Sequence, residues 1–434
     1  MRGKVSLLAG FGLFTYAFLT AELLFNTCAA GVLGEAAALP LYGGGCLAAA
    51  AGYLLWPLAC RLPPDRHRQA LLAVAALGAF CSLVLPFAAN PALLVAAYLL
   101  GLLLAGMTGG AALHGLARQL PLPRLGITIA APYAGAFALQ ALATWAAGLL
   151  AEPFAAALQH CLVAAALAAA GLLLPVAWPE APRPTPTTTA RTTRYLWLGL
   201  ASCVVICCLF GLADGIVMNL YTGQQLDAQD AVRLICIPGI LFAGWMADVK
   251  EGSLFPFATI AAMTAIIVAF HLFNTAETFN AALGCVYFFG SFMTMYSIAV
   301  FVGRAVRTAN PSRWAVAGRA AKYLVGGIFA LTSAALFNAL GLLWVTAVYV
   351  LALIALLGVR LLSPTLNALP PEDVADDPPD ALSEREHEVL AMLRSGATTA
   401  EISARLFITQ NTVRVHIRNI KRKTGAPTRE HLAR

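Results

Sequence analysis

Runs of about 20 apolar residues, separated by short polar patches, recur along most of this chain. A run of that length crosses the roughly 30 Å hydrocarbon layer of a bilayer as one helix. Hydrophobic residues make up 60% of the sequence, more than one globular core can bury. We therefore expect an all-α, polytopic membrane bundle. About twelve candidate spans fall near residues 5–33, 38–60, 70–88, 92–117, 126–150, 154–178, 195–222, 232–249, 254–273, 280–303, 320–340 and 341–362.

Charges between the spans predict an orientation, because Lys and Arg accumulate on the cytoplasmic side of membrane proteins. With the N-terminus inside, the basic residues fall only in segments expected to be cytoplasmic. These residues are Arg2, Lys4, Arg61, Arg66, Arg68, Arg118, Arg124, Arg183, Arg191, Arg194, Lys250, Arg304, Arg307, Arg313 and Arg319. The outer loops contain acids or no charge. The pattern predicts that both termini lie in the cytoplasm.

A Pro- and Thr-rich segment, residues 179–194, lies between the sixth and seventh spans. Such a composition resists regular structure, so it divides the membrane domain, residues 1–362, into two halves. The halves are residues 1–178 and 195–362, each with six predicted helices.

Twelve spans, cytoplasmic termini and a central cytoplasmic loop together resemble the major facilitator superfamily. The sequence Gly244-Trp-Met-Ala-Asp248-Val-Lys-Glu-Gly252 is similar to the Gly-x-x-x-Asp-x-x-x-Gly cytoplasmic motif of that family. It departs from the pattern at Glu251, near which a basic pair is usual. The equivalent turn after the second span is degraded, and topology carries most of the resemblance.

Two acids, Glu22 and Asp214, lie in the first and seventh spans. Each is followed nine residues later by a glycine, and Asn219 follows Asp214. An ionisable group inside a span costs ~2.5 kcal/mol or more and usually marks a functional cavity. The first and seventh spans of major facilitator proteins line the central cavity, so the resemblance places Glu22, Asp214 and Asn219 at a candidate ligand site. The alternative is that the acids lie near the outer interface, where a charge costs little.

The remaining polar and aromatic residues of the spans are typical of helix packing. Single polar side chains often bond a neighbouring helix, and this reading is favoured over ligand contact for His114, Gln140, His160 and His271. Core or lipid contact is likewise favoured for Tyr287, Phe288, Phe289 and Tyr296. The ten cysteines all lie in apolar segments without metal-ligand spacing, so we expect neither a metal site nor disulfides.

The end of the chain changes character. An acidic, Pro-rich linker, residues 363–381, precedes a basic segment, residues 382–434. This asymmetry separates a linker from a nucleic-acid-binding module. As a flexible coil the linker spans only about 25 Å, so DNA must come to the membrane. Its acids are also expected to compete with phosphate for the basic module in an off state.

Capping signatures predict the first helices of the module. Ser383 with Glu386 forms a capping box that opens one helix, and Gly396 ends it as a left-handed cap. Thr398 with Glu401 repeats the capping box and opens a second, shorter helix.

A third helix, residues 410–422, is amphipathic. Val413, Ile417 and Ile420 form an apolar stripe that can pack on the preceding helices. The other side carries side chains suited to base edges and phosphates in the major groove. They are Asn411, Thr412, Arg414, Arg418, Lys421 and Arg422.

The whole module resembles the LuxR-type helix-turn-helix, through Leu382-Ser-x-Arg-Glu-x-Glu-Val-Leu390, Gly396, Glu401-Ile402, Leu406-x-Ile408, Thr412-Val413-Arg414-x-His416-Ile417-x-Asn419-Ile420 and Lys423-x-Gly425. The resemblance implies that Arg414, Val415 and Arg418 face the bases. It implies that Thr412, Lys421 and Lys423 lie along the DNA backbone and that Glu388 makes an internal contact. The fourth, dimer-forming helix is cut to residues 428–434. A basic tail lying on anionic lipid is the alternative.

These features predict a transcriptional regulator in the bacterial cytoplasmic membrane, a one-component sensor that binds promoter DNA as a dimer. A small-molecule effector and contact with RNA polymerase are further expectations. The alternatives are a transporter with a regulatory tail and a passive anchor that responds to a partner. We find no nucleotide-binding loop, nucleophile elbow or cofactor motif, so we do not expect an enzyme.

Overall fold

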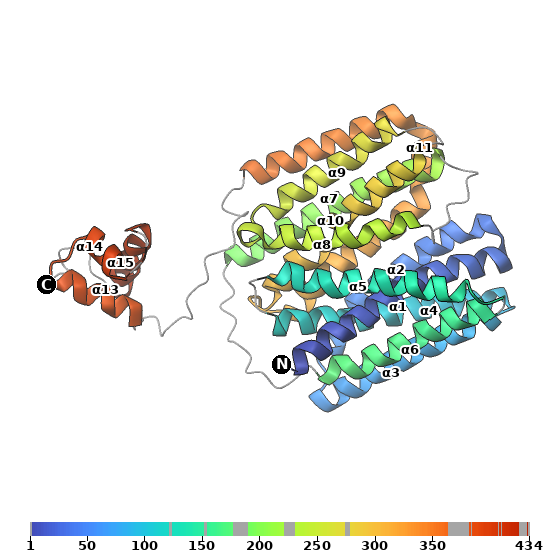
Figure 1. Ribbon diagram of the computed structural model, residues 1–434, viewed down its shortest axis with the longest axis horizontal. Coiled ribbons are helices and arrows are strands. Elements are labelled where there is room, and N and C mark those ends of the chain that lie inside the picture. Colours follow the sequence, from blue (N-terminus) through green and yellow to red (C-terminus); the bar gives the residue numbers. More distant parts are fainter. Residues whose placement is uncertain are drawn as a thin grey trace. The chain divides into compact units, whose positions relative to one another are not determined.

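The computed structural model describes residues 2–120, 124–151, 154–176, 190–220, 231–273, 278–362, 382, 384–406, 408, 410–424 and 432. The chain divides into two compact units, residues 1–369 and 370–434. In the described part of the first unit every regular element is a helix, and the helices lie side by side (Figure 1). The expected all-α bundle is confirmed.

The first half of the bundle contains α1 (Arg2–Leu33), α2 (Glu35–Ala59), α3 (Pro64–Val84), α4 (Pro91–Gln119), α5 (Leu125–Ala147) and α6 (Phe154–Val176). The second contains α7 (Ala190–Leu220), α8 (Cys236–Asp248), α9 (Phe255–Leu272), α10 (Phe279–Ala305) and α11 (Pro311–Leu362). Three short 3₁₀ turns complete the unit: η1 (Leu85–Phe87), η2 (Ala231–Ile235) and η3 (Val249–Gly252).

The long helix α11 consists of two helices that meet at Gly341. This residue has φ 72° and ψ 168°, a conformation that is essentially restricted to glycine. With α11 divided there, the described part of the first unit contains twelve α-helical segments, as the apolar runs predict. Ten of them are long and apolar enough to cross a membrane. The other two are α8, with 13 residues, and the first part of α11, some of whose side chains lie outside what the structure describes.

Within the first half, α1 packs against α4, α5 and α6, and within the second, α10 packs against α8, α9 and α11. The halves meet where α2 lies along α11 and where α5 lies along α8. The bundle therefore has the two six-helix halves that the sequence predicts, when the two parts of α11 are counted as separate helices.

Asp248, in the motif that ends α8, joins the two halves. Its carboxylate oxygens accept hydrogen bonds from the backbone amides of Gly126 (2.7 Å) and Ile127 (2.9 Å) in the first turn of α5. These amides have no partner within their own helix, and a carboxylate there also interacts favourably with the helix dipole. The backbones are close: a Cβ on Gly126 would lie 2.2 Å from the carbonyl oxygen of Gly244.

Two arginines that were predicted to lie in a cytoplasmic loop are instead inside the bundle. Arg304 lies in the last turn of α10 and is 6% exposed, and Arg319 lies well within α11 and is 4% exposed. Arg304 stacks on the ring of Tyr195 at 4.0 Å. The loop itself is only residues 306–310, so the loop prediction was wrong for both residues, because a basic side chain near a span end can also turn inward onto aromatic rings.

The second unit is a small helical domain. Its described helices are α13 (Glu384–Arg394), α14 (Thr399–Leu406) and α15 (Gln410–Thr424). They enclose a core of Val389, Leu390, Leu393, Ile402, Leu406, Val413, Ile417, Ile420 and Leu432. Ser383, and residues 428–434 apart from Leu432, where the fourth helix is predicted, lie outside the described residues.

Gly396 ends α13 with φ 82°. The amide of Gly396 donates to the Leu393 carbonyl (3.1 Å), and the amide of Ala397 donates to the Met392 carbonyl (3.0 Å). This pair of bonds is the Schellman motif. The predicted left-handed cap is confirmed.

Candidate DNA-binding surface and membrane cavity

The predicted capping box at the start of α14 is present. The Glu401 carboxylate accepts hydrogen bonds from the Thr398 amide (2.7 Å) and hydroxyl (2.9 Å), and the Glu401 amide donates to the Thr398 hydroxyl at 3.3 Å. The bonds from Thr398 stabilise the charged carboxylate, and they lower the pKa of Glu401 below its usual value. The box sets where α14 begins, and therefore how the turn presents α15.

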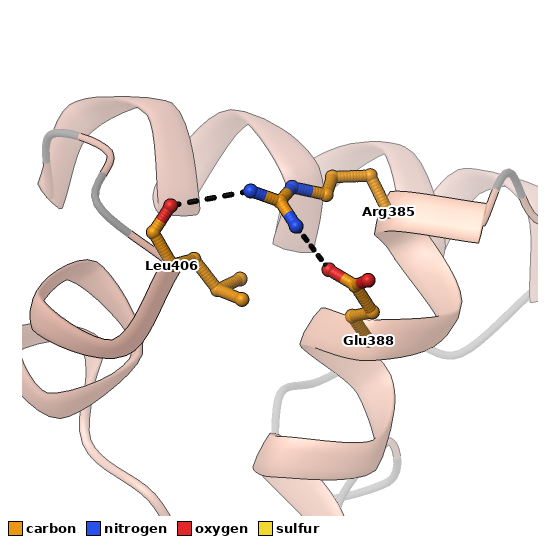
Figure 2. A network of polar contacts seen from close by, with 3 residues as sticks. All are labelled: Arg385, Glu388 and Leu406. Carbon is orange, nitrogen blue, oxygen red and sulfur yellow. Dashed lines mark hydrogen bonds and ion pairs between the residues drawn. The ribbon is translucent and has the colours of Figure 1, made fainter.

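Arg385 ties the first helix of the domain to the second (Figure 2). Its guanidinium donates to the Glu388 carboxylate one turn along α13 and to the Leu406 carbonyl at the end of α14, the latter at 3.2 Å. Glu388 thus makes a contact inside the domain. Because a helix C-terminus leaves carbonyls without partners, the arginine also satisfies one of the last carbonyls of α14.

The third helix, α15, has one buried and one exposed face. Val413 and Ile420 are fully buried and Ile417 nearly so. Arg414 and Arg418 are exposed, as is Val415 at 37%. A helix held by its apolar face and exposing two arginines four residues apart has the form of a recognition helix for the major groove.

Two of the other predicted DNA contacts have described side chains. Thr412 and Lys421 are half-buried on α15. The side chains of Asn411, Arg422 and Lys423 lie outside what the structure describes, although all three residues belong to the helix. Their predicted roles on DNA stay predictions, like those of Arg414, Val415 and Arg418.

The membrane unit contains a cavity of about 220 Å³ between its halves. Among its lining side chains are Glu22 of α1, Arg233 of η2 and Lys322 of α11. Glu22 therefore lines a cavity, and its assignment as a ligand contact stays a prediction. The side chains of Asp214 and Asn219 lie outside the described residues, so their assignment stays a prediction.

The Glu22 carboxylate is surrounded by positive charge. Lys322, Arg319 and Arg233, in that order, are the cations that act on it most strongly. One of its oxygens is buried without a hydrogen-bond partner among the described residues.

Arg319 is fixed on the edge of this cluster by aromatic hydroxyls. Its guanidinium donates to the Tyr323 hydroxyl (2.9 Å) and to the Tyr133 hydroxyl (3.5 Å), and it also lies over both rings. Tyr133 comes from α5, so the contact links the two halves beside the cavity.

Sequence reasoning missed the cations of this site. Lys322 and Arg233 fall within predicted spans, and an ionisable residue inside a span is a signal of function. That signal was applied to the acids alone. Arg319 was assigned to a loop, from which its contact with Tyr133 could not be foreseen.

The isolated polar residues make contacts between or within helices. Gln140 donates to the Thr20 hydroxyl at 3.2 Å, and His271 contacts the Ile267 carbonyl one turn earlier. His114 and His160 lie near cysteine thiols of other helices at 3.5 Å and 3.7 Å. These contacts agree with the packing role favoured from the sequence. Tyr287 differs, because it lines the cavity.

Comparison with known proteins identifies the second unit. Residues 380–434 match the family "Bacterial regulatory proteins, luxR family". Over 54 residues the chain is 44% identical to a nitrate/nitrite response regulator protein homolog of Haemophilus influenzae and to the transcriptional activator protein AhyR of Aeromonas hydrophila. Each match covers 12% of this chain. It covers 26% of the Haemophilus protein and 21% of AhyR. The C-terminal segment is therefore a LuxR-type helix-turn-helix domain, and the likeness ends there.

The first unit has the fold of major facilitator transporters. It is similar to the proton:xylose symporter XylE with a TM-score of 0.57 and 15% identity, over 82% of this chain and 95% of that one. The human organic anion transporter MFSD10 gives a TM-score of 0.53 and 15% identity, over 84% and 99%. At this identity the likeness shows the fold alone. Together with ten apolar spans it makes the chain a multi-pass membrane protein.

Proposed function

We propose that this protein is a membrane-bound transcriptional regulator that binds promoter DNA through α15. The observation that carries the proposal is a LuxR-type domain with exposed Arg414 and Arg418, on the same chain as a major facilitator-like bundle. Curated relatives of that domain are named as a response regulator and a transcriptional activator. Because the domain must reach DNA, both termini lie in the cytoplasm, and the membrane is the cytoplasmic membrane of a bacterium.

The membrane unit is proposed to be the sensor. Its charged cavity could hold a small-molecule effector, and binding there would change the conformation or self-association of the bundle. Two DNA-binding domains held by one membrane dimer gain a high effective concentration, which favours paired binding to DNA. Such a dimer on DNA, in contact with RNA polymerase, is the proposed active form. No catalytic activity is part of the proposal.

The test is genome-wide DNA occupancy of the intact protein in its native membrane. The Arg414→Ala/Arg418→Ala double variant should lose discrete promoter peaks, because it removes two exposed cations without touching the buried stripe. Arg394→Ala is the matched control, since it removes an exposed cation at the end of α13. Peaks that persist in the double variant, or their absence under every growth condition, would contradict the proposal.

A second candidate function is transport with a regulatory tail, which the major facilitator fold favours. The two are distinguished by flux in the double variant, where a transporter keeps its activity although DNA binding is lost. A third, passive-anchor reading predicts that substitution of Glu22 leaves regulation intact. The sensor reading predicts that it does not.

A further inference from the structure

The cavity of the membrane unit carries an excess of positive charge among the side chains that the structure describes. Lys322 and Arg233 line it, with Glu22 as the acid. Arg319 stands beside them and adds a third cation to the field at Glu22. Among the described side chains, one carboxylate and two cations therefore line a cavity whose other walls are mostly apolar or aromatic.

Lys322 has an aromatic neighbour but no close carboxylate among the described residues. Its ammonium group lies 5.1 Å from the centre of the Tyr323 ring. No carboxylate oxygen of the described residues lies within 4.0 Å of this ammonium group. The ion pair found among the described residues is Arg385–Glu388, in the C-terminal domain. A cation inside a membrane bundle is costly unless it is paired or solvated. An anion entering the cavity would supply the missing charge.

The walls of the cavity restrict the size and the chemistry of the uncharged part of such an anion. Aromatic side chains from five segments surround the charged group: Tyr42, Tyr133, Phe137, Phe210, Tyr287 and Phe329. A dry cavity of roughly 150 Å³ holds benzene. The 220 Å³ available here therefore suits a single ring and one small charged substituent.

We propose that this cavity binds a one-ring organic monocarboxylate, with the carboxylate beside Lys322 and the ring among the aromatic walls. Anion binding does not depend on the proposed function; only the role of this anion as the effector rests on it. Glu22 carries the same sign of charge as the anion. It holds Lys322 in the empty cavity and competes with the ligand when the cavity is filled.

The experiment uses the full chain in lipid nanodiscs and measures ligand-induced shifts in Tm and the Kd from titration. The probes are benzoate and cyclohexanecarboxylate, with benzamide and benzylamine as a neutral and a cationic match. A carboxylate should stabilise the protein, whereas the amide and the amine should not. Loss of one charge-assisted contact in Lys322→Gln should weaken binding about 10- to 100-fold, and Lys322→Arg should retain most of it.

Glu22→Gln should act in the opposite direction and tighten carboxylate binding several-fold, because it removes a like charge. If either residue had only a structural role, the two substitutions would not change carboxylate affinity in opposite directions. Lys250→Gln is the control, since Lys250 is an exposed cation outside the cavity. Equal stabilisation by benzamide or benzylamine, no effect of either carboxylate at millimolar concentration, or weaker binding in Glu22→Gln would overturn the inference. The Glu22→Gln arm decides the matter if Lys322→Gln does not fold.

The two proposals can fail separately. If benzoate binds but leaves promoter occupancy unchanged, the anion site stands and the sensor role does not. If promoter peaks depend on Arg414 and Arg418 while no carboxylate binds, the regulator stands and the anion site does not.

Discussion

Substitution of Asp248 by Asn should weaken the contact between the halves at α5 and α8. The two bonds to α5, at 2.7 and 2.9 Å, both end on a charged carboxylate. Asn keeps one acceptor and turns an NH₂ group toward a backbone donor, so one charge-assisted bond, worth about 1.5–3 kcal/mol, is lost. Loss of the interaction with the helix dipole adds about 0.3–1 kcal/mol. Since Asp248 is partly exposed, the lower end of the sum, about 2 kcal/mol, is expected.

The assay is thermal unfolding of the purified full chain in one detergent, with Lys250→Gln as a control two residues away. Asp248→Asn should lower the Tm by a few degrees relative to that control. Gly126→Ala should disturb the same contact by sterics, because its Cβ would meet the Gly244 carbonyl at 2.2 Å. If Asp248→Asn unfolds at the temperature of the control, the carboxylate does not hold α5, and the reasoning is refuted.

Three further predictions follow from single positions. Ile420→Ala removes a fully buried side chain and should destabilise the C-terminal domain by about 2–5 kcal/mol; occupancy at promoters should fall while membrane insertion, measured by fractionation, is kept. At Glu401 the folded-state pKa is lowered, so the capping box contributes stability at neutral pH. That stability is lost as the pH falls through the folded-state pKa, below about 4.5. Acid unfolding followed by circular dichroism should therefore differ between the wild type and Glu401→Gln only above that range. Gly341→Ala should destabilise the bundle by about 1–3 kcal/mol, because φ is 72° there, and an unchanged Tm would contradict the account of the break in α11.

The sequence predicted the elements whose signals are local. Apolar run lengths located the helices of the bundle, and the predicted boundary between the last two spans, at residues 340 and 341, coincides with the break at Gly341. Gly396 and the Thr398–Glu401 box were found because a cap depends on residues within one turn. The buried stripe of α15 followed from helical periodicity.

The membrane site could be predicted only in part. Glu22, which the sequence singles out because its charge lies within an apolar run, lines the cavity. The inward orientation of Arg319 depends on Tyr133, which is 186 residues away, and the role of Asp248 depends on amides of α5 more than 120 residues away. Such pairings are set by the packing of one helix on another, and composition does not report them.

The central claim is that one chain holds lipid and specific DNA at the same time. The most direct measurement is selection of genomic DNA fragments by the purified chain in lipid nanodiscs, followed by flotation to recover particles that contain both. We expect a small set of sequences to be enriched in the floated fraction and to be lost with Arg414→Ala/Arg418→Ala. Fragments that float without sequence enrichment, or that are enriched equally by the double variant, would contradict the account.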